Sequence, residues 1–197
     1  MPMIPAFLLV LLAVVYRIAV GIMVQSGSIS LSSFAPIAAI ALCSAVYFPG
    51  RYKFVVPFAA MFVSDLVLNT YYGASLADLS VFAHYFGIAA VVLLGVALQN
   101  RAALKTMIPA SIAGSVIFYL ITNVFSWIAD PGYVKSLGGL IQAVTVGLPA
   151  YSATPTWMFL RNALVSDLIF TCAFVLCISL AGARQRSRAT STVARAA

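Results

Sequence analysis

Two aspartates in apolar surroundings are the residues of this 197-residue chain most able to do chemistry. Asp65 and Asp167 stand in the same four-residue sequence, Val-Ser-Asp-Leu, inside apolar runs long enough to cross a bilayer. A carboxylate in hydrocarbon costs about 2.5 kcal/mol or more, so such residues usually face a bundle interior or a wet cavity and find a partner there. The two aspartates can bind a cationic or hydrogen-bonding substrate, or exchange a proton or Na⁺.

Further polar residues in apolar runs complete a candidate substrate site. Asn69 follows Asp65 by four residues and therefore shares its helix face. Asparagine both donates and accepts hydrogen bonds, which suits a neutral heterocycle or amide. The alternative is structural: arginines neutralise the aspartates in ion pairs that fix packing, and asparagines link helices. The predicted site consists of Asp65, Asn69, Asn123, Arg161, Asn162 and Asp167, with Arg17 balancing charge.

Composition indicates a membrane protein. Hydrophobic residues make up 63% of the chain and charged residues 8%, and there is no glutamate; soluble domains carry about 25% charged residues. The net charge of +7 comes from basic residues at the ends of apolar runs and in the C-terminal tail, where lipid and topology explain them, so we expect no nucleic-acid binding. The three cysteines show neither metal-site nor disulfide spacing.

The elements that must position these residues are six predicted transmembrane helices. Their expected ranges are 5–24, 34–48, 54–72, 79–99, 103–128 and 157–180. Between the last two, Leu140–Tyr151 is apolar but too short to cross as a helix, which predicts an interfacial or re-entrant piece that can act as a lid. Residues 181–197 are predicted to be a disordered basic cytoplasmic tail, so the single domain covers 1–180.

Basic residues predict the orientation. They gather in the turns after the second and fourth spans and in the tail, which places both termini in the cytoplasm. With a rise of 1.5 Å per residue, Asp65 and Asp167 then lie about 16 Å and 15 Å from the starts of their helices, near the bilayer midplane. Most other intramembrane polar residues fall in the outer half. The sequence thus predicts a polar cavity open to the outside and closed by apolar packing toward the cytoplasm.

The repeated Val-Ser-Asp-Leu sequence, in the third and sixth spans, fits two inverted three-helix halves, because an odd number of spans per half inverts the second. A chance match is equally possible, because the chain is built from few residue types.

The remaining candidate residues indicate no chemistry. His84 is expected to form an interfacial hydrogen bond, since no second histidine supports a metal site, and Cys43 is expected to be a buried structural thiol. No catalytic motif is present, so no enzyme activity, cofactor or metal is expected.

Five stretches carry a resemblance to known proteins: Phe34–Leu42, Pro57–Asn69, Tyr119–Asn123, Gly132–Leu140 and Arg161–Leu168. Together they resemble an uncharacterised family of small bacterial membrane proteins that are described as candidate transport proteins. That family is similar to the substrate-binding (S) components of energy-coupling-factor (ECF) vitamin transporters. The resemblance implies a six-helix bundle in a bacterial inner membrane with an outward-facing pocket beneath extracellular loops.

One departure from that resemblance concerns partners. S components dock on a shared energising module through an Ala-x-x-x-Ala pattern in the first helix, whereas here the pattern occurs as Ala35/Ala39 and Ala41/Ala45 in the second span. Docking on such a module is therefore doubtful.

The sequence predicts an all-α protein that takes up a small vitamin-like or other polar solute. A proton- or cation-coupled carrier using both aspartates and a non-transport membrane scaffold are the alternatives.

Overall fold

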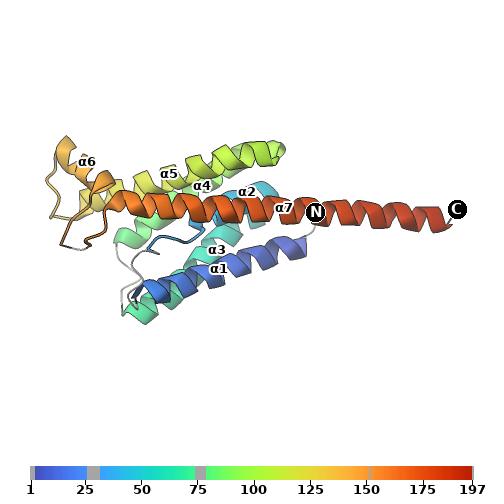
Figure 1. Cartoon of the computed structure of the whole chain (residues 1–197), viewed down its shortest axis with the longest axis horizontal. Helices are drawn as coiled ribbons and strands as arrows, with labels where there is room; N and C mark the ends of the chain where they lie inside the picture. The colour runs from blue at the N-terminus through green and yellow to red at the C-terminus, as the bar shows by residue number, and fades with distance from the viewer. Residues whose placement is uncertain (1–2, 26–31, 74–78, 151, 197) are drawn as a thin grey trace.

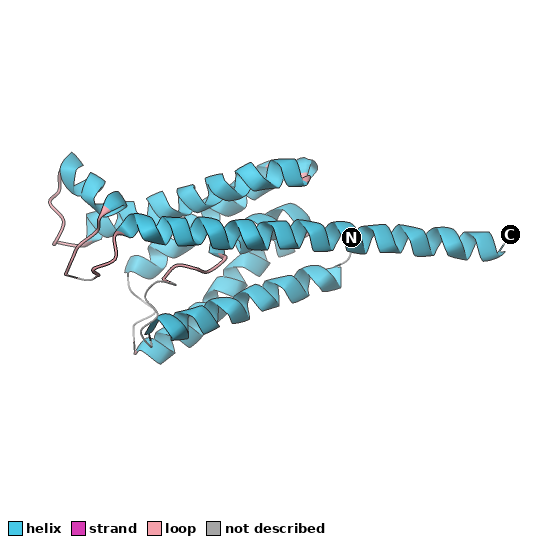
Figure 2. Ribbon diagram, in the orientation of Figure 1, coloured by secondary structure: helices cyan, strands magenta, loops and turns pink. Residues whose placement is uncertain are grey.

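The protein is built from α-helices. The computed structural model describes residues 3–25, 32–73, 79–150 and 152–196, with side chains except at 79–80, 100 and 185–196. Within these ranges there are seven α-helices, one short 3₁₀ helix and no strands (Figures 1 and 2), which confirms the all-α class. The elements are α1 (Met3–Gln25), α2 (Ile37–Tyr47), α3 (Tyr52–Tyr72), α4 (Leu79–Ala97), η2 (Gln99–Arg101), α5 (Leu104–Ala129), α6 (Leu137–Thr145) and α7 (Thr156–Ala196).

Four helices are long and apolar enough to cross a membrane: α1, α3, α5 and the part of α7 from Thr156 to Arg184. Their outward side chains are apolar; Leu8, Phe62 and Ile169 are 59%, 52% and 55% exposed. Such large apolar exposure suits hydrocarbon and not water. Two shorter apolar helices, α2 and the described part of α4, occupy two of the other expected spans. Within the described residues, length therefore supports a membrane protein with four full spanning helices, and the count of six spans stays a prediction.

Helix α2 is the centre of the bundle. Nine of its 11 residues are buried, and it packs against α3, α4, α5 and α7. A helix that is apolar all round belongs in such an interior position. Close approach to α4 depends on small residues, because a Cβ added at Gly95 would lie 2.6 Å from the Cβ of Ala45. Packing between α2 and α4 thus explains Ala45, one of the alanines in the pattern of the second span.

The second span is not one continuous helix as predicted. Residues 32–36 are not helical, and α2 begins only at Ile37. Figure 1 shows this segment entering the bundle, with α2 starting inside it and running toward the end where both termini lie. Eleven residues rise about 16 Å, roughly half the thickness of the hydrocarbon layer. The non-helical segment 32–36 and the half-helix α2 therefore together occupy the expected second span.

The two ends of the bundle differ. The N-terminus and the C-terminal part of α7 lie toward one end, and α6 lies at the other (Figure 1). Helix α7 continues through 181–196, where composition predicted disorder, and projects beyond the other helices. Disorder of this tail in solution stays a prediction. The elements that position the candidate site are the interior start of α2, the middles of α5 and α7, and the connection from α5 to α7.

Candidate functional site

Asp167 caps the interior N-terminus of α2. The backbone N–H of Ala39 donates to Asp167 Oδ1 at 2.8 Å, across 128 residues of sequence. Pro36, at the N-cap position, provides no side-chain cap for the free amides of the first turn. The second carboxylate oxygen, Oδ2, accepts from the hydroxyl of Ser115 on α5 at 2.7 Å. Asp167 is 1% exposed, so a fixed carboxylate joins α2, α5 and α7 at mid-depth.

A cavity of about 340 Å³ lies above this carboxylate. Its walls come from the start of α2, from α4, α5 and α7, and from the connection between α5 and α7. This volume lies at the small end of the range for small-molecule sites, about 300–1,000 Å³. The lining residues are Ser33, Ala35, Ile37, Ala38, His84, Ser115, Phe118, Tyr119, Thr122, Asn123, Ser126, Tyr133, Val146, Gly147, Leu148, Ser152, Thr154, Thr156, Phe159, Ala163 and Asp167.

The lining combines aromatic rings with hydroxyl groups. His84 stacks on Phe118, with ring centroids 5.8 Å apart. Tyr119, Tyr133 and Phe159 add further rings, and serines and threonines from α5, α7 and the connecting loop add hydroxyls. No lysine or arginine is among the lining residues, and Asp167 is the only acidic one. The cavity can therefore stack a flat molecule and hydrogen-bond to it around a single buried acid.

The connection between α5 and α7 covers the cavity. Its helix α6 starts at the capping residue Ser136, whose hydroxyl oxygen accepts from Gly139 N–H at 3.2 Å. The hydroxyl of Tyr119 on α5 donates to the carbonyl of Val144 at 2.7 Å, which fixes α6 over the cavity. The apolar piece predicted over 140–151 is thus helical only to Thr145, and Tyr151 lies outside the described residues.

A left-handed turn leads from α6 into the loop above the cavity. Gly147 has φ +78°, a conformation that favours glycine. Its carbonyl accepts from the side-chain amide of Gln142 at 3.1 Å, and its N–H donates to the backbone carbonyl of the same residue at 2.8 Å. The cover is therefore a hydrogen-bonded unit joined to the bundle at α5 and α7.

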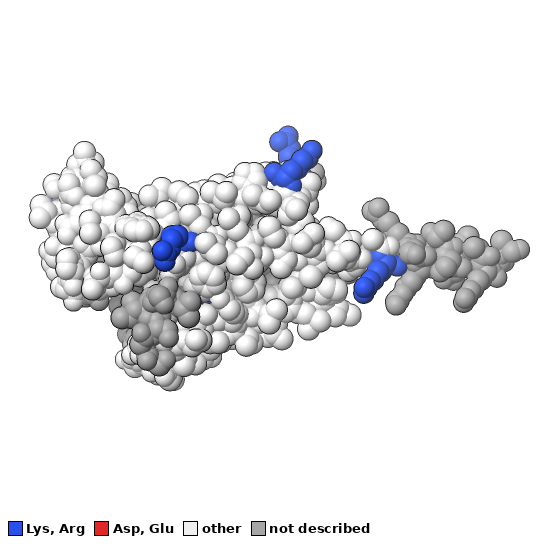
Figure 3. Space-filling model, viewed as in Figure 1, with Lys and Arg blue, Asp and Glu red and all other residues white. Residues whose placement is uncertain are grey.

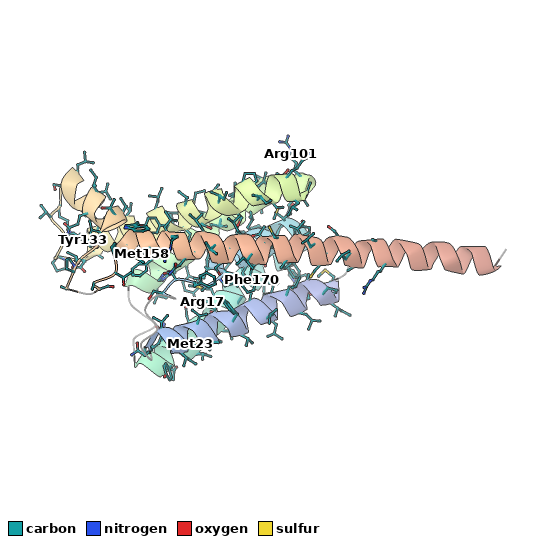
Figure 4. All side chains as sticks on the ribbon, in the orientation of Figure 1. Arg17, Met23, Arg101, Tyr133, Met158 and Phe170 are labelled. Carbon is teal, nitrogen blue, oxygen red and sulfur yellow. The ribbon has the colours of Figure 1, made fainter. Side chains whose placement is uncertain are left out.

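Asp65 lies in a different place. Arg17 on α1 donates to its Oδ1 at 2.7 Å, and the same guanidinium donates to the hydroxyl of Ser64. The Arg17 and Asp65 side chains are 11% and 9% exposed, and Figure 4 shows Arg17 inside the outline of the bundle. Asp65 is not among the residues that line the cavity. The geometry matches the structural alternative, in which an arginine neutralises the acid.

The other predicted site residues divide between the cavity and its surroundings. Asn123 lines the cavity, and its amide donates to the Tyr119 carbonyl at 2.8 Å. The amide of Asn162 donates to the Ser32 carbonyl at 2.9 Å, which holds the segment before α2 against α7.

Two further predicted site residues lie outside the cavity lining. Arg161 is exposed, with its guanidinium 6.0 Å from the ring centre of Trp157. Asn69 is half-buried on α3. Of the six, only Asn123 and Asp167 therefore line the cavity.

The sequence analysis missed a polar seam below the cavity floor. The hydroxyl of Thr171 on α7 donates to that of Ser111 on α5 at 3.1 Å, and both residues are at most 1% exposed. Ser111 and Ser115 are four residues apart, as are Asp167 and Thr171, so this spacing was the available signal. The prediction of mainly apolar packing on the closed side of the site is thus refined to a packed core crossed by small hydroxyls.

Fold and cavity together define a helical membrane protein with an internal pocket that has a buried acid at its floor. The chain matches a family described as a family of unknown function (DUF6580) over residues 2–190, and it belongs to that family. Searches of curated proteins and of solved structures found no match. The expected membership of an uncharacterised family is thus supported, whereas the relation to transport proteins and to ECF S components has no support from these comparisons.

Proposed function

We propose that the protein binds a small molecule in this cavity and takes it up across the membrane. The observation that carries the proposal is a cavity of about 340 Å³ with a buried carboxylate at its floor, enclosed by membrane helices and covered by a connecting segment. A pure scaffold has no use for such a volume, since membrane helices gain stability by close packing. We propose no catalytic activity, because the sequence contains no known catalytic motif.

The proposed orientation has six passages and both termini in the cytoplasm. In this proposal, the second passage consists of the non-helical segment 32–36 followed by α2. In Figure 3, basic side chains gather toward the C-terminal end of the bundle, with one group nearer the other end; Figure 4 places Arg101 at the former end and Tyr133 at the latter. The positive-inside rule then turns the covered cavity outward. A bacterial inner membrane and likeness to ECF S components are part of this proposal.

A proton- or cation-coupled carrier is the second candidate. The buried carboxylate of Asp167 favours it, because intramembrane acids often carry coupling ions. Asp65 contributes less to this candidate than the sequence suggested, since Arg17 already balances its charge. Uptake that depends on a proton or Na⁺ gradient would distinguish this carrier from one without coupling.

Retention of a ligand tests the proposed function. Ala163 lines the cavity, so Ala163→Phe places a ring inside it, whereas Ile169→Phe adds a ring on the lipid-facing side of the same helix. We expect native mass spectrometry of the gently purified wild type to show a retained small molecule. The molecule should persist in Ile169→Phe and disappear in Ala163→Phe.

The same experiment can reject the proposal. If wild type, Ala163→Phe and Ile169→Phe retain the same species, that species is bound outside the cavity. If the wild type retains nothing, uptake into reconstituted vesicles provides the second test. Vesicles that contain the wild type or one of the same variants are supplied on the outside with solutes extracted from cells, and uptake of these solutes is measured. No uptake above empty vesicles, or equal uptake by wild type and Ala163→Phe, would leave the scaffold reading as the better one.

A further inference from the structure

Asp167 is a buried acid that, among the residues that the structure describes, forms no ion pair with a lysine or arginine. In the described part of the chain, the ion pair between Arg17 and Asp65 uses the only arginine inside the bundle. No lysine or arginine lines the cavity, and by sequence none occurs in 26–31, in 74–78 or at 151. Lys135, on the covering connection, donates to the backbone carbonyls of Trp127 and Asp130. The protein therefore supplies Asp167 with hydrogen bonds but with no full positive charge.

The hydrogen bonds that Asp167 does receive leave room for another donor. An ionised carboxylate can accept about four hydrogen bonds, and Asp167 accepts from three donors, the backbone amides of Ala38 and Ala39 and the Ser115 hydroxyl. The N-terminus of a helix contributes about half a positive charge, which is less than the carboxylate carries. Since buried charges are paired or coordinate a cation, a positive group from outside the chain would complete this site.

We propose that the cavity selects a small organic cation: an ammonium group that donates to Asp167, attached to a flat ring that stacks on the aromatic wall. Phe118, Tyr119, Tyr133 and Phe159 offer ring faces, which attract cations as well as apolar rings. Serine and threonine hydroxyls can accept the remaining N–H groups. This inference rests on the proposed function, because it names the chemical class of the molecule that the same cavity takes.

Other ligand classes fit less well. A carboxylate or phosphate would lie against the charge of Asp167 without any lysine or arginine to offset it. A bare metal ion would need several close oxygen or nitrogen ligands, and within the described residues no group of three or more His, Cys, Asp and Glu could hold one. The volume of about 340 Å³ also far exceeds that of an ion. Charge and size together favour an amine.

Three probes of matched shape test the inference: tryptamine, tryptophol and indole-3-acetate carry the same ring with charges of +1, 0 and −1. We expect tryptamine to bind the wild type about tenfold or more tightly than tryptophol, and indole-3-acetate to bind most weakly, as for a charge-assisted hydrogen bond. Thermal shift and equilibrium binding in one detergent provide the measurements. Ala163→Phe corrects for partition into the micelle, because only binding lost in that variant belongs to the cavity.

Asp167→Asn sharpens the test, because it removes the charge and keeps an oxygen to accept from Ala39. In this variant, we expect tryptamine to lose its preference while tryptophol changes little. If Asp167→Asn does not fold, the ranking of the three probes on the wild type still decides. Equal binding of tryptamine and tryptophol, or tightest binding of indole-3-acetate, overturns the inference. The proposed function nevertheless survives such a result if Ala163→Phe abolishes the binding of these probes, because the cavity then still binds a small molecule. If no probe binds, the inference fails, and ligand retention by the wild type decides the proposed function separately.

Discussion

The two Val-Ser-Asp-Leu stretches share four residues but have different surroundings. In α3, Asp65 pairs with Arg17 of α1, away from the cavity. In α7, Asp167 caps the half-helix α2, accepts from Ser115 and forms the cavity floor. Local sequence placed both acids at mid-depth, yet the neighbouring helix decides what each one does. The paired acid joins α1 to α3, whereas the acid that lines the cavity is the one that we propose to contact a ligand.

The comparison also bears on the possible internal repeat. In two inverted halves, α2 and α5 would occupy corresponding positions, but they contain 11 and 26 residues. The partners of the two aspartates differ as well: a guanidinium for Asp65, and a backbone amide and a hydroxyl for Asp167. The repeat therefore gains no support from the middle helices.

Breaking the Arg17–Asp65 pair should have the largest effect on stability. Arg17→Leu leaves the nearly buried carboxylate without its cation, which should cost about 3–5 kcal/mol of unfolding free energy. Arg17→Leu/Asp65→Leu should recover most of the loss, because apolar packing replaces the pair. Unfolding by a denaturing detergent measures both variants. A double variant as unstable as the single one would contradict a simple packing role for this pair.

Removing the carboxylate of Asp167 should cost less, because no charge is left unpaired. Asp167→Ala deprives Ala39 N–H and the Ser115 hydroxyl of their acceptor, and we expect a loss of about 2–4 kcal/mol. Val165→Ala, at a residue that is 45% exposed in the same stretch, is the control and should change stability less. Equal losses in the unfolding measurement would show that Asp167 does not stabilise α2.

Ser115→Ala removes one contact of Asp167, together with the bond from the same hydroxyl to the Ser111 carbonyl of its own helix. We expect a loss of about 1–2 kcal/mol, since the carboxylate loses a buried donor. The effects of Ser115→Ala and Asp167→Ala should be less than additive in a double-mutant cycle, because both remove the same hydrogen bond. Ser126→Ala is the matched control on α5: its hydroxyl is exposed and donates to its own helix at Thr122. Strict additivity would argue against the Ser115–Asp167 bond.

The smallest expected effect compares two threonines, one near each aspartate. Thr171 is fully buried and donates to Ser111 across helices, whereas Thr70 is exposed and donates to Leu66 of its own helix. Thr171→Val should cost about 0.5–1.5 kcal/mol, and Thr70→Val should be nearly neutral. Thermal unfolding of the two variants side by side checks the difference. If Thr70→Val lost more stability than Thr171→Val, the hydrogen bond between Thr171 and Ser111 would not stabilise the α5–α7 interface.

Helix length made the long elements predictable. The ends of α1, α3 and α5 fall within a few residues of the expected limits, because apolar runs bounded by polar turns determine where such helices end. The start of α2 was not predictable in the same way. Ser33-Phe34-Ala35-Pro36 is apolar enough to continue a span, and nothing local indicates that Asp167, far along the chain, caps a helix beginning at Ile37.

The candidate site shows the same division between local and distant information. Burial of Asp167 followed from its apolar neighbours, and a partner for Asp65 among the arginines was already one of the alternatives. Ser115 was missed because a serine inside a helix usually bonds to its own backbone. Only its position opposite Asp167 on α7 gives it a second role. Asn162 was expected to bind substrate, but the structure has it donating to the Ser32 carbonyl at 2.9 Å.

The long sequence separation of the cap on α2 has a consequence for biosynthesis. The ribosome completes α2 before the residue 128 positions later that caps it has been made. Until α7 has entered the membrane, the first amides of α2 lack this acceptor in a layer that offers little water. The half-helix must therefore settle late, after the last span has been inserted. Nascent chains that stop before α7 should be recognised by membrane quality control through the unfinished α2.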